Sequence, residues 1–112
     1  MKHIMRLNNG PFESVKSGTK TIELRLNDEK RSLINEGDTI EFENRTTSEK
    51  LEVKVLKLHK YNNFEELYKH FDKVSLGYKP DEEAHPSDME EYYSKEEQQE
   101  FGVIAIKIKV IQ

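Results

Sequence analysis

The sequence predicts an α+β domain: a small, strongly curved mixed β-sheet, closed as a barrel, with short helices around it. The chain has 112 residues, the size of one domain with a single modest core. It contains at least five strand-like segments and a few short helical ones. So many short strands in so short a chain are typical of a small barrel. We therefore expect residues 1–112 to form one domain of about five to six strands.

The first elements are a strand and a helix. Residues 3–7 are predicted to form a short strand. The turn sequence Asn-Gly-Pro follows, and Pro11 suits the first position of a helix. We predict a helix over residues 11–17, because Phe12 and Val15 have helical spacing and Gly18 stands where a C-terminal cap is expected.

The next strand, residues 20–26, alternates with a period of two. Its apolar face carries Ile22, Leu24 and Leu26. Its polar face carries Thr21, Glu23 and Arg25. At ~3.3 Å per residue, Glu23 and Arg25 lie about 7 Å apart along the strand, so their side chains are expected to act together.

The middle of the chain predicts one helix and a hairpin. Asn27 or Asp28 can cap a short helix over residues 29–34. Residues 39–43 form the next strand, and a polar loop leads to its partner, which starts at residue 51. The apolar phase changes near residues 55–56, which indicates a β-bulge.

The last third predicts two helices, an irregular stretch and a final strand. Asn62 or Asn63 can cap a helix with an apolar stripe, and residues 75–86 are irregular. Asp88 is expected to cap a turn or helix through residue 93. Ser94 and Glu97 form a capping box for a further helix that ends at Gly102. Residues 103–111 alternate isoleucine or valine with lysine, as a half-buried strand does.

The composition excludes several classes of protein. The chain has no cysteine, which rules out disulfides and thiolate metal sites, and no apolar leader or membrane span is evident. We therefore expect a cytoplasmic protein with no membrane contact. The four histidines show no metal-ligand spacing, so neither a metal nor another cofactor is expected.

The charge is unevenly distributed. The net charge is −4, yet residues 81–100 hold nine acidic residues and one lysine, a net of −8, so the rest of the chain carries +4. A mildly basic body with one acidic segment differs from a uniformly acidic protein.

The run Gly18-Thr19-Lys20-Thr21-Ile22-Glu23-Leu24-Arg25 fits the pattern G-x-K-x-x-E-x-R. It resembles the ASCH domain, a PUA-like β-barrel family. The helix before this motif, Asp28-x-Lys30-Arg31 after it, the Glu36-Gly37-Asp38 turn and the closing strand are also similar to that family, as are the Leu76-Gly77-Tyr78 corner and the Tyr92-Tyr93-Ser94 segment. The resemblance covers nearly the whole chain.

This resemblance implies a cleft between barrel and helices, lined by the motif, and a role in recognising RNA or a modified nucleoside, in RNA metabolism or translation-related regulation. Some members are hydrolases that act on N4-acetylcytidine or on RNA. In the small amidohydrolases of the family, a K-x-x-T pattern supplies an activating lysine and a nucleophilic threonine. Lys20 matches the lysine, but Glu23 stands at the threonine position, so the expected nucleophile is missing.

The residue types themselves indicate how such a cleft would bind. Glu23, kept ionised by its neighbours, can accept a hydrogen bond from a base amino group. Arg25 offers a planar fork for phosphate or a surface for stacking, and Lys20 offers a phosphate contact or, if desolvated, a general base. Lys30 and Arg31 extend a basic rim, and Tyr93 or Tyr92 supplies a stacking ring.

Three functions stay open from the sequence. The first is a module that binds RNA or a modified nucleoside through Lys20, Glu23 and Arg25. The second is a hydrolase, an amidohydrolase or ribonuclease, in which Lys20 and Glu23 are catalytic. The third is a protein-interaction domain in which the cluster is structural. We also expect the acidic segment 81–100 to fold beside the cleft and to narrow access to it. The sequence carries no indication of oligomeric state.

Overall fold

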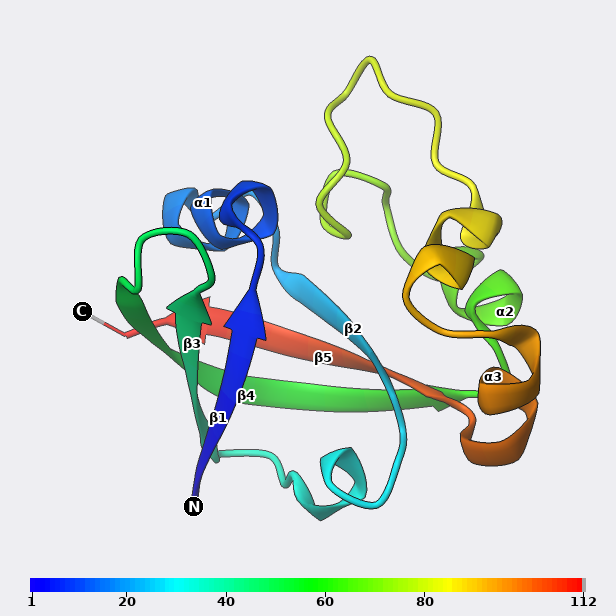
Figure 1. The fold of residues 1–112 in the computed structure, drawn as a ribbon, viewed down its shortest axis with the longest axis horizontal. Helices are drawn as coiled ribbons and strands as arrows, with labels where there is room; N and C mark the ends of the chain where they lie inside the picture. Colours follow the sequence, from blue (N-terminus) through cyan, green and yellow to red (C-terminus); the bar gives the residue numbers. More distant parts are fainter. Residues whose placement is uncertain (112) are drawn as a thin grey trace.

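The computed structural model describes residues 1–111, and five of its segments form one mixed sheet with strand order β1-β3-β4-β5-β2 (Figure 1). The strands are β1 (Lys2–Leu7), β2 (Ile22–Leu26), β3 (Thr39–Asn44), β4 (Lys50–Tyr61) and β5 (Val103–Val110). The helices are α1 (Asn9–Ser17), α2 (Phe64–Tyr68) and α3 (Lys95–Phe101), with 3₁₀ helices η1 (Arg31–Leu33) and η2 (Pro86–Glu91). Only β1 and β3 are parallel, and every other pair is antiparallel.

The sheet curves into a half-barrel with a core on each face. On the inner face, Phe12 and Val15 of α1 pack against residues from β1, β3, β4 and β5. On the outer face, α2 and the segment between α2 and η2 pack against β2 and the start of β5 through Phe64, Leu67 and Leu76. Strands β1 and β2 are the two edges of the sheet, so the predicted barrel is confirmed as a half-barrel with short peripheral helices.

Most predicted elements are present, with shifted ends. Helix α1 starts at Asn9, two residues before the predicted start, and ends at Gly18 with a φ of 87°. The Asn63 side chain caps α2, and the capping box of Ser94 and Glu97 opens α3, as predicted. The bulge lies between Val55 and Lys57 of β4.

Two local predictions were wrong. The helix expected over residues 29–34 is only the three-residue η1: Asp28 accepts from the Arg31 amide, as a cap does, but Ile34 is extended and packs into the inner core, which ends the turn. Asp88 lies inside η2, where His85 is the N-cap; its Oδ2 completes the capping box by accepting from the His85 amide and also accepts from the Tyr78 hydroxyl.

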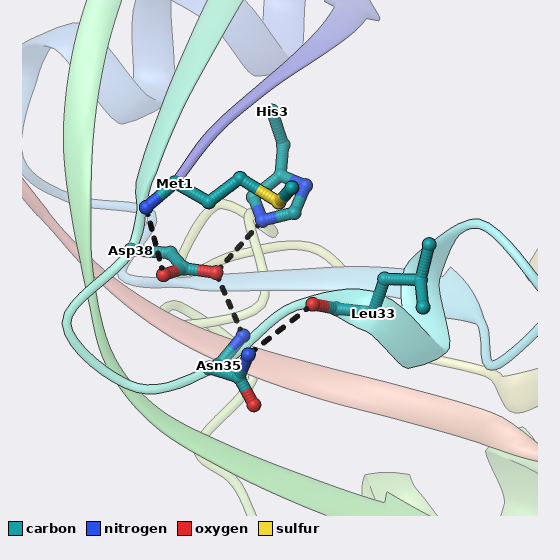
Figure 2. A network of polar contacts seen from close by, with 5 residues as sticks. All are labelled: Met1, His3, Leu33, Asn35 and Asp38. Carbon is teal, nitrogen blue, oxygen red and sulfur yellow. Dashed lines mark hydrogen bonds and ion pairs between the residues drawn. The ribbon is translucent and has the colours of Figure 1, made fainter.

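The turn before β3 is fixed by Asp38 (Figure 2). Its Oδ1 accepts from the N-terminal ammonium at 3.2 Å, and its Oδ2 lies 2.8 Å from Nε2 of His3 and 2.9 Å from the Asn35 amide. The His3 bond and the Asn35 amide hold the pKa of Asp38 at about 2, below its usual 3.8. Asp38 therefore joins β1 to the start of β3, its parallel neighbour.

Candidate functional site

Strand β2 is buried on both faces, which determines where its charged residues go. Its register with β5 pairs Glu23 with Ile106 and Arg25 with Ile104. Both isoleucines belong to the inner core, so the charged face of β2 lies on the inner side of the half-barrel. Glu23 retains only 2% of its exposure. The polar face predicted from the period of two is therefore an interior face, and a simple solvent-exposed ion pair is excluded.

Glu23 binds a cation on each of its carboxylate oxygens. Oε1 lies 3.1 Å from Nζ of Lys20. Oε2 accepts a hydrogen bond from Nε of Arg25 at 2.9 Å and also lies 2.9 Å from Nη2 of the same guanidinium. Arg25 also donates from Nη2 to the backbone carbonyl of Arg6 at 2.9 Å, so its side chain connects β2 to β1, the two edges of the sheet. We call Lys20, Glu23 and Arg25 the ion triad.

Two members of the ion triad, Glu23 and Arg25, favour their charged forms. Burial acts to raise the pKa of Glu23, but the charges and hydrogen bonds of Lys20 and Arg25 outweigh burial and lower it. Burial acts to lower the pKa of Arg25, but the charges and hydrogen bonds of Glu23 and Tyr93 together outweigh burial and raise it.

The backbone around Lys20 positions its side chain. The left-handed Gly18 ends α1, and the amides of Thr19 and Lys20 both donate to the Ser14 carbonyl. Gly77 lies against the aliphatic part of Lys20: a Cβ added there would stand 3.0 Å from Cδ. Only a residue without a side chain leaves this room, so Gly77 helps to direct Lys20 towards Glu23.

The ion triad opens into a cleft of about 670 Å³. One wall comes from the end of β1 and the start of α1, and the other from residues 76–93, which lie across β2 from α1 in Figure 1. Ligand pockets in proteins span roughly 300–1,000 Å³, so the cleft has the volume to hold a small molecule. Four tyrosines line it: Tyr68, Tyr78, Tyr92 and Tyr93.

The tyrosines of the cleft play different parts. The Tyr78 hydroxyl donates to Asp88 at 2.7 Å and therefore accepts from the Tyr68 hydroxyl at 2.8 Å, since a hydroxyl has one proton. Tyr93 stacks on Phe64, with ring centroids 5.9 Å apart. Burial raises the pKa of Tyr93 and nearby Arg25 opposes this rise. Tyr92 is 55% exposed, so its ring has a free face.

The structure brings four of the predicted site residues together. Lys20, Glu23, Arg25 and Tyr93 all line the cleft. Lys30 is exposed, and Arg31 binds Asp28 at 3.1 Å; neither is among the cleft residues. The predicted acidic segment does reach the cleft, through Glu82, Asp88 and Glu91 among others.

Sequence reasoning missed several cleft residues. Arg6, Arg45 and Lys79 add positive charge from three separate parts of the chain. The ring of Tyr68 packs against the outer core, while its hydroxyl faces Tyr78. The one available signal was the Leu76-Gly77-Tyr78 corner, since glycine between regular elements marks a turn.

A second, more open groove of about 1470 Å³ lies away from the ion triad, between the end of β4, α2, η2 and α3. Its lining is mostly amide and acidic side chains, and it shares no residue with the cleft. Across residues 1–111, no three histidine, cysteine or carboxylate side chains gather as metal ligands. None of the helices formed by these residues is long and apolar enough to cross a membrane.

Comparison with known proteins agrees with this geometry. Hypothetical protein PH0355 has a crystal structure with a TM-score of 0.80 and 33% identity, over 99% of this chain and all of that one. Protein PF0455 from Pyrococcus furiosus, solved by NMR, gives a TM-score of 0.73 and 32% identity, over 100% and 99% of the two chains. An ASCH protein from Zymomonas mobilis shares the fold at a TM-score of 0.70 and 13% identity, over 96% of this chain and 66% of that one.

No curated protein matches the chain. The ASCH domain family model, in contrast, matches residues 5–112, nearly the full length. The motif, the half-barrel and the structural relatives lead to the same assignment, and the chain belongs to the ASCH domain family, with its PUA-like fold.

Proposed function

We propose that this ASCH domain binds RNA or a modified nucleoside in the cleft formed around Lys20, Glu23 and Arg25. One observation carries the proposal: three charged side chains, Lys20 and Glu23 buried and Arg25 nearly so, fix one another and face a cavity large enough for a nucleotide. Keeping charges in such a place costs stability, which favours a use for them beyond folding. The family, whose PUA-like fold is often associated with RNA, supports the same class of ligand.

Each member of the triad keeps capacity for a ligand. The bonds to Glu23 and Arg6 use Nε and Nη2 of Arg25, which leaves Nη1 for a phosphate oxygen or the Tyr93 hydroxyl. Lys20 has two further donors beyond its contact with Glu23. Each Glu23 oxygen has lone pairs beyond those used by its cations, so it can accept from an amino group such as N4 of cytosine.

The cleft walls add contacts of a different kind. Tyr92, with its exposed ring, is the better stacking surface for a base, because Tyr93 already packs on Phe64. Glu82 and Glu91 place negative charge at the rim and favour a small or single-stranded ligand over a duplex. Arg31 is close enough to Tyr93 to act on its pKa, so with Lys30 it would extend the basic rim outside the cleft.

The proposal is tested by titrating cytidine 5′-monophosphate into the protein in a calorimeter. Lys20→Ala is expected to weaken binding about tenfold or more, because it removes a direct phosphate contact. Arg25→Lys keeps the charge but loses the planar fork, so an intermediate loss is expected. Lys16 of α1 forms an exposed ion pair with Glu49. Lys16→Ala breaks this pair and serves as a control that should bind normally. If both cleft variants bind as tightly as the wild type, the cleft is not the site.

The hydrolase alternative needs Lys20 or Glu23 as a base towards water. The lowered pKa of Glu23 makes its carboxylate a weak base, which favours binding over catalysis. Incubation with N4-acetylcytidine, followed by chromatography, separates the two functions. A binding module leaves the substrate intact; release of cytidine that disappears in Lys20→Ala would establish the hydrolase.

A further inference from the structure

Four exposed lysines face one another in pairs across the two central strands. In the register of β4 with β5, Lys54 is opposite Lys109 and Lys57 is opposite Lys107. Directly opposed residues of an antiparallel pair project from the same face with Cβ atoms about 4.5–5.5 Å apart. All four side chains are exposed. We call these residues the lysine ladder.

The ladder lies on the outer face, where the helical cover stops. The next pair along the same face is His59 and Ala105, and Phe71 packs edge-on against His59 at 5.6 Å. From there onward the outer core covers the sheet. Figure 1 shows α2 and α3 beside the start of β5, while its far end carries neither helix. The ladder therefore begins at the rim of the outer core and faces solvent.

On the neighbouring half of the same sheet, lysines lie close to acidic residues. On β1, Lys2 binds Glu41 of β3 at 3.0 Å and Glu52 of β4 at 2.8 Å. Lys50 of β4 stands opposite Glu43. None of the four ladder lysines has a carboxylate within ion-pair distance among residues 1–111. The positive charge is balanced on one half of the sheet and left unbalanced on the other.

A common reason for lysine on a strand does not apply to the ladder. Lysines often protect a sheet edge from pairing with another chain, but Lys54 and Lys107 each have a paired strand on both sides, with Thr39 of β3 and Ile22 of β2 as their second partners. Like charges placed directly opposite also destabilise a sheet. Two such pairs in succession therefore oppose folding slightly, and a bound polyanion would remove that repulsion.

We propose that the lysine ladder binds the phosphodiester backbone of a single-stranded RNA whose base occupies the cleft; the ligand class rests on the function proposed above. Lys107 and Lys109 are two residues apart on β5, about 7 Å at ~3.3 Å per residue, which resembles the spacing of successive phosphates along an extended strand. The ladder and the charged face of β2 lie on opposite faces of the sheet, so the RNA strand would pass around the start of the edge strand β2, where the partner of Lys107 is Ile22, two residues from Lys20 of the ion triad. The ladder consists of ammonium groups alone, which suits it to position a backbone without reading its sequence.

The salt dependence of binding tests this proposal. For single strands, the logarithm of the association constant falls with the logarithm of salt concentration with a slope of about −0.7 per phosphate contact. In the variant Lys54→Gln, Lys57→Gln, Lys107→Gln and Lys109→Gln, the slope for a twelve-residue oligouridine should become shallower by about 3. The matched control changes four lysines that already have an acidic neighbour: Lys2→Gln, Lys16→Gln, Lys50→Gln and Lys69→Gln. It loses the same net charge and should shift the slope by less than about 1.

The outcomes separate this inference from the proposed function. Binding of cytidine 5′-monophosphate tests the cleft alone and should not change in the ladder variant. An oligouridine slope equal to that of the wild type, or to that of the control, overturns the ladder while leaving the cleft intact. The RNA proposal is also overturned if the ladder variant loses binding to phosphatidylserine vesicles while its salt slope for oligouridine is unchanged. The ladder would then bind a membrane surface. Mononucleotide binding that survives Lys20→Ala counts against the cleft and leaves the ladder standing.

Discussion

The chain holds two buried carboxylates that bind several donors each, and they serve different purposes. Asp38 receives the N-terminal ammonium, His3 and the Asn35 amide, three partners that tie β1 to the start of β3. Glu23 receives Lys20 and Arg25 and ties β2 to β1 through the Arg25 contact with the Arg6 carbonyl. Both carboxylates have a lowered pKa, so acidity alone does not tell them apart.

The difference lies in what the partners face. None of the residues joined by Asp38 lines either of the two cavities described above, so this network acts as a structural joint. The partners of Glu23 keep unused donors and face the cleft. The shifted pKa of a buried ionic group is by itself weak evidence of function. Hydrogen-bond donors that are unused and face a cavity of ligand size are stronger evidence.

The largest effect is expected from Glu23→Gln. This change leaves two buried cations, Lys20 and Arg25, without their counterion. Removing one partner of a buried ionic group typically costs about 3–5 kcal/mol, and here both cations lose the same partner. Urea unfolding measures the loss. The control Glu49→Gln breaks an exposed pair with Lys16 and should cost far less. A small loss in Glu23→Gln would mean that water reaches the cations in the folded protein.

Two glycine substitutions test whether the residues around the cleft affect ligand binding while those around Asp38 affect only stability. Gly77, against Lys20, has a φ of 109°, and Gly37, beside Asp38, has a φ of 90°. Alanine at either position is strained, by about 1–3 kcal/mol. Only at Gly77 does the new Cβ meet a neighbour, Cδ of Lys20 at 3.0 Å; at Gly37 nothing lies within 4 Å.

Both alanine variants should therefore lose stability, but only Gly77→Ala should also weaken binding of cytidine 5′-monophosphate. Calorimetric titration at a temperature where both variants are folded separates the two effects. Equal affinities for the two variants would show that Lys20 moves aside without consequence, and would remove the positioning role assigned to Gly77.

The joint at Asp38 predicts a pH dependence. Its pKa is about 2 in the folded protein and 3.8 in the reference state, so the folded state binds fewer protons. Asp38 therefore stabilises the fold above about pH 4, and this contribution is lost as the pH falls towards 2. In Asp38→Asn, the destabilisation measured at pH 6 should shrink steadily between pH 4 and pH 2. A deficit that stays constant over this range would mean that the charge of Asp38 is not what stabilises the joint.

The local pattern of the sequence predicted much of this site because β2 is short and regular. Its period of two placed Glu23 and Arg25 on one face, and the motif singled out Lys20. Periodicity describes a strand on its own, however, and which face becomes the inside of a curved sheet depends on its neighbours. The register with Ile104 and Ile106 of β5 made the charged face an interior one.

The far wall of the cleft was beyond such reasoning. Residues 76–93 form no strand or α-helix, and their place is set by contacts with distant parts of the chain. The Ser75 carbonyl accepts from the amides of Thr21 and Ile22, which docks the irregular segment onto the start of β2. Tyr78 and Asp88 then reach the cleft through a hydrogen bond that no periodic pattern encodes.

The smallest effect is expected within this wall. Tyr78→Phe removes the hydroxyl that donates to Asp88 and accepts from Tyr68, at a cost of about 1 kcal/mol for a net hydrogen bond. Tyr68→Phe removes only the hydrogen bond between the Tyr68 and Tyr78 hydroxyls and should cost less, because Tyr78 still donates to Asp88. Thermal unfolding of both variants and the double variant measures the coupling. If the two single losses add fully in the double variant, the two hydroxyls act independently, and the wall is held by ring packing alone.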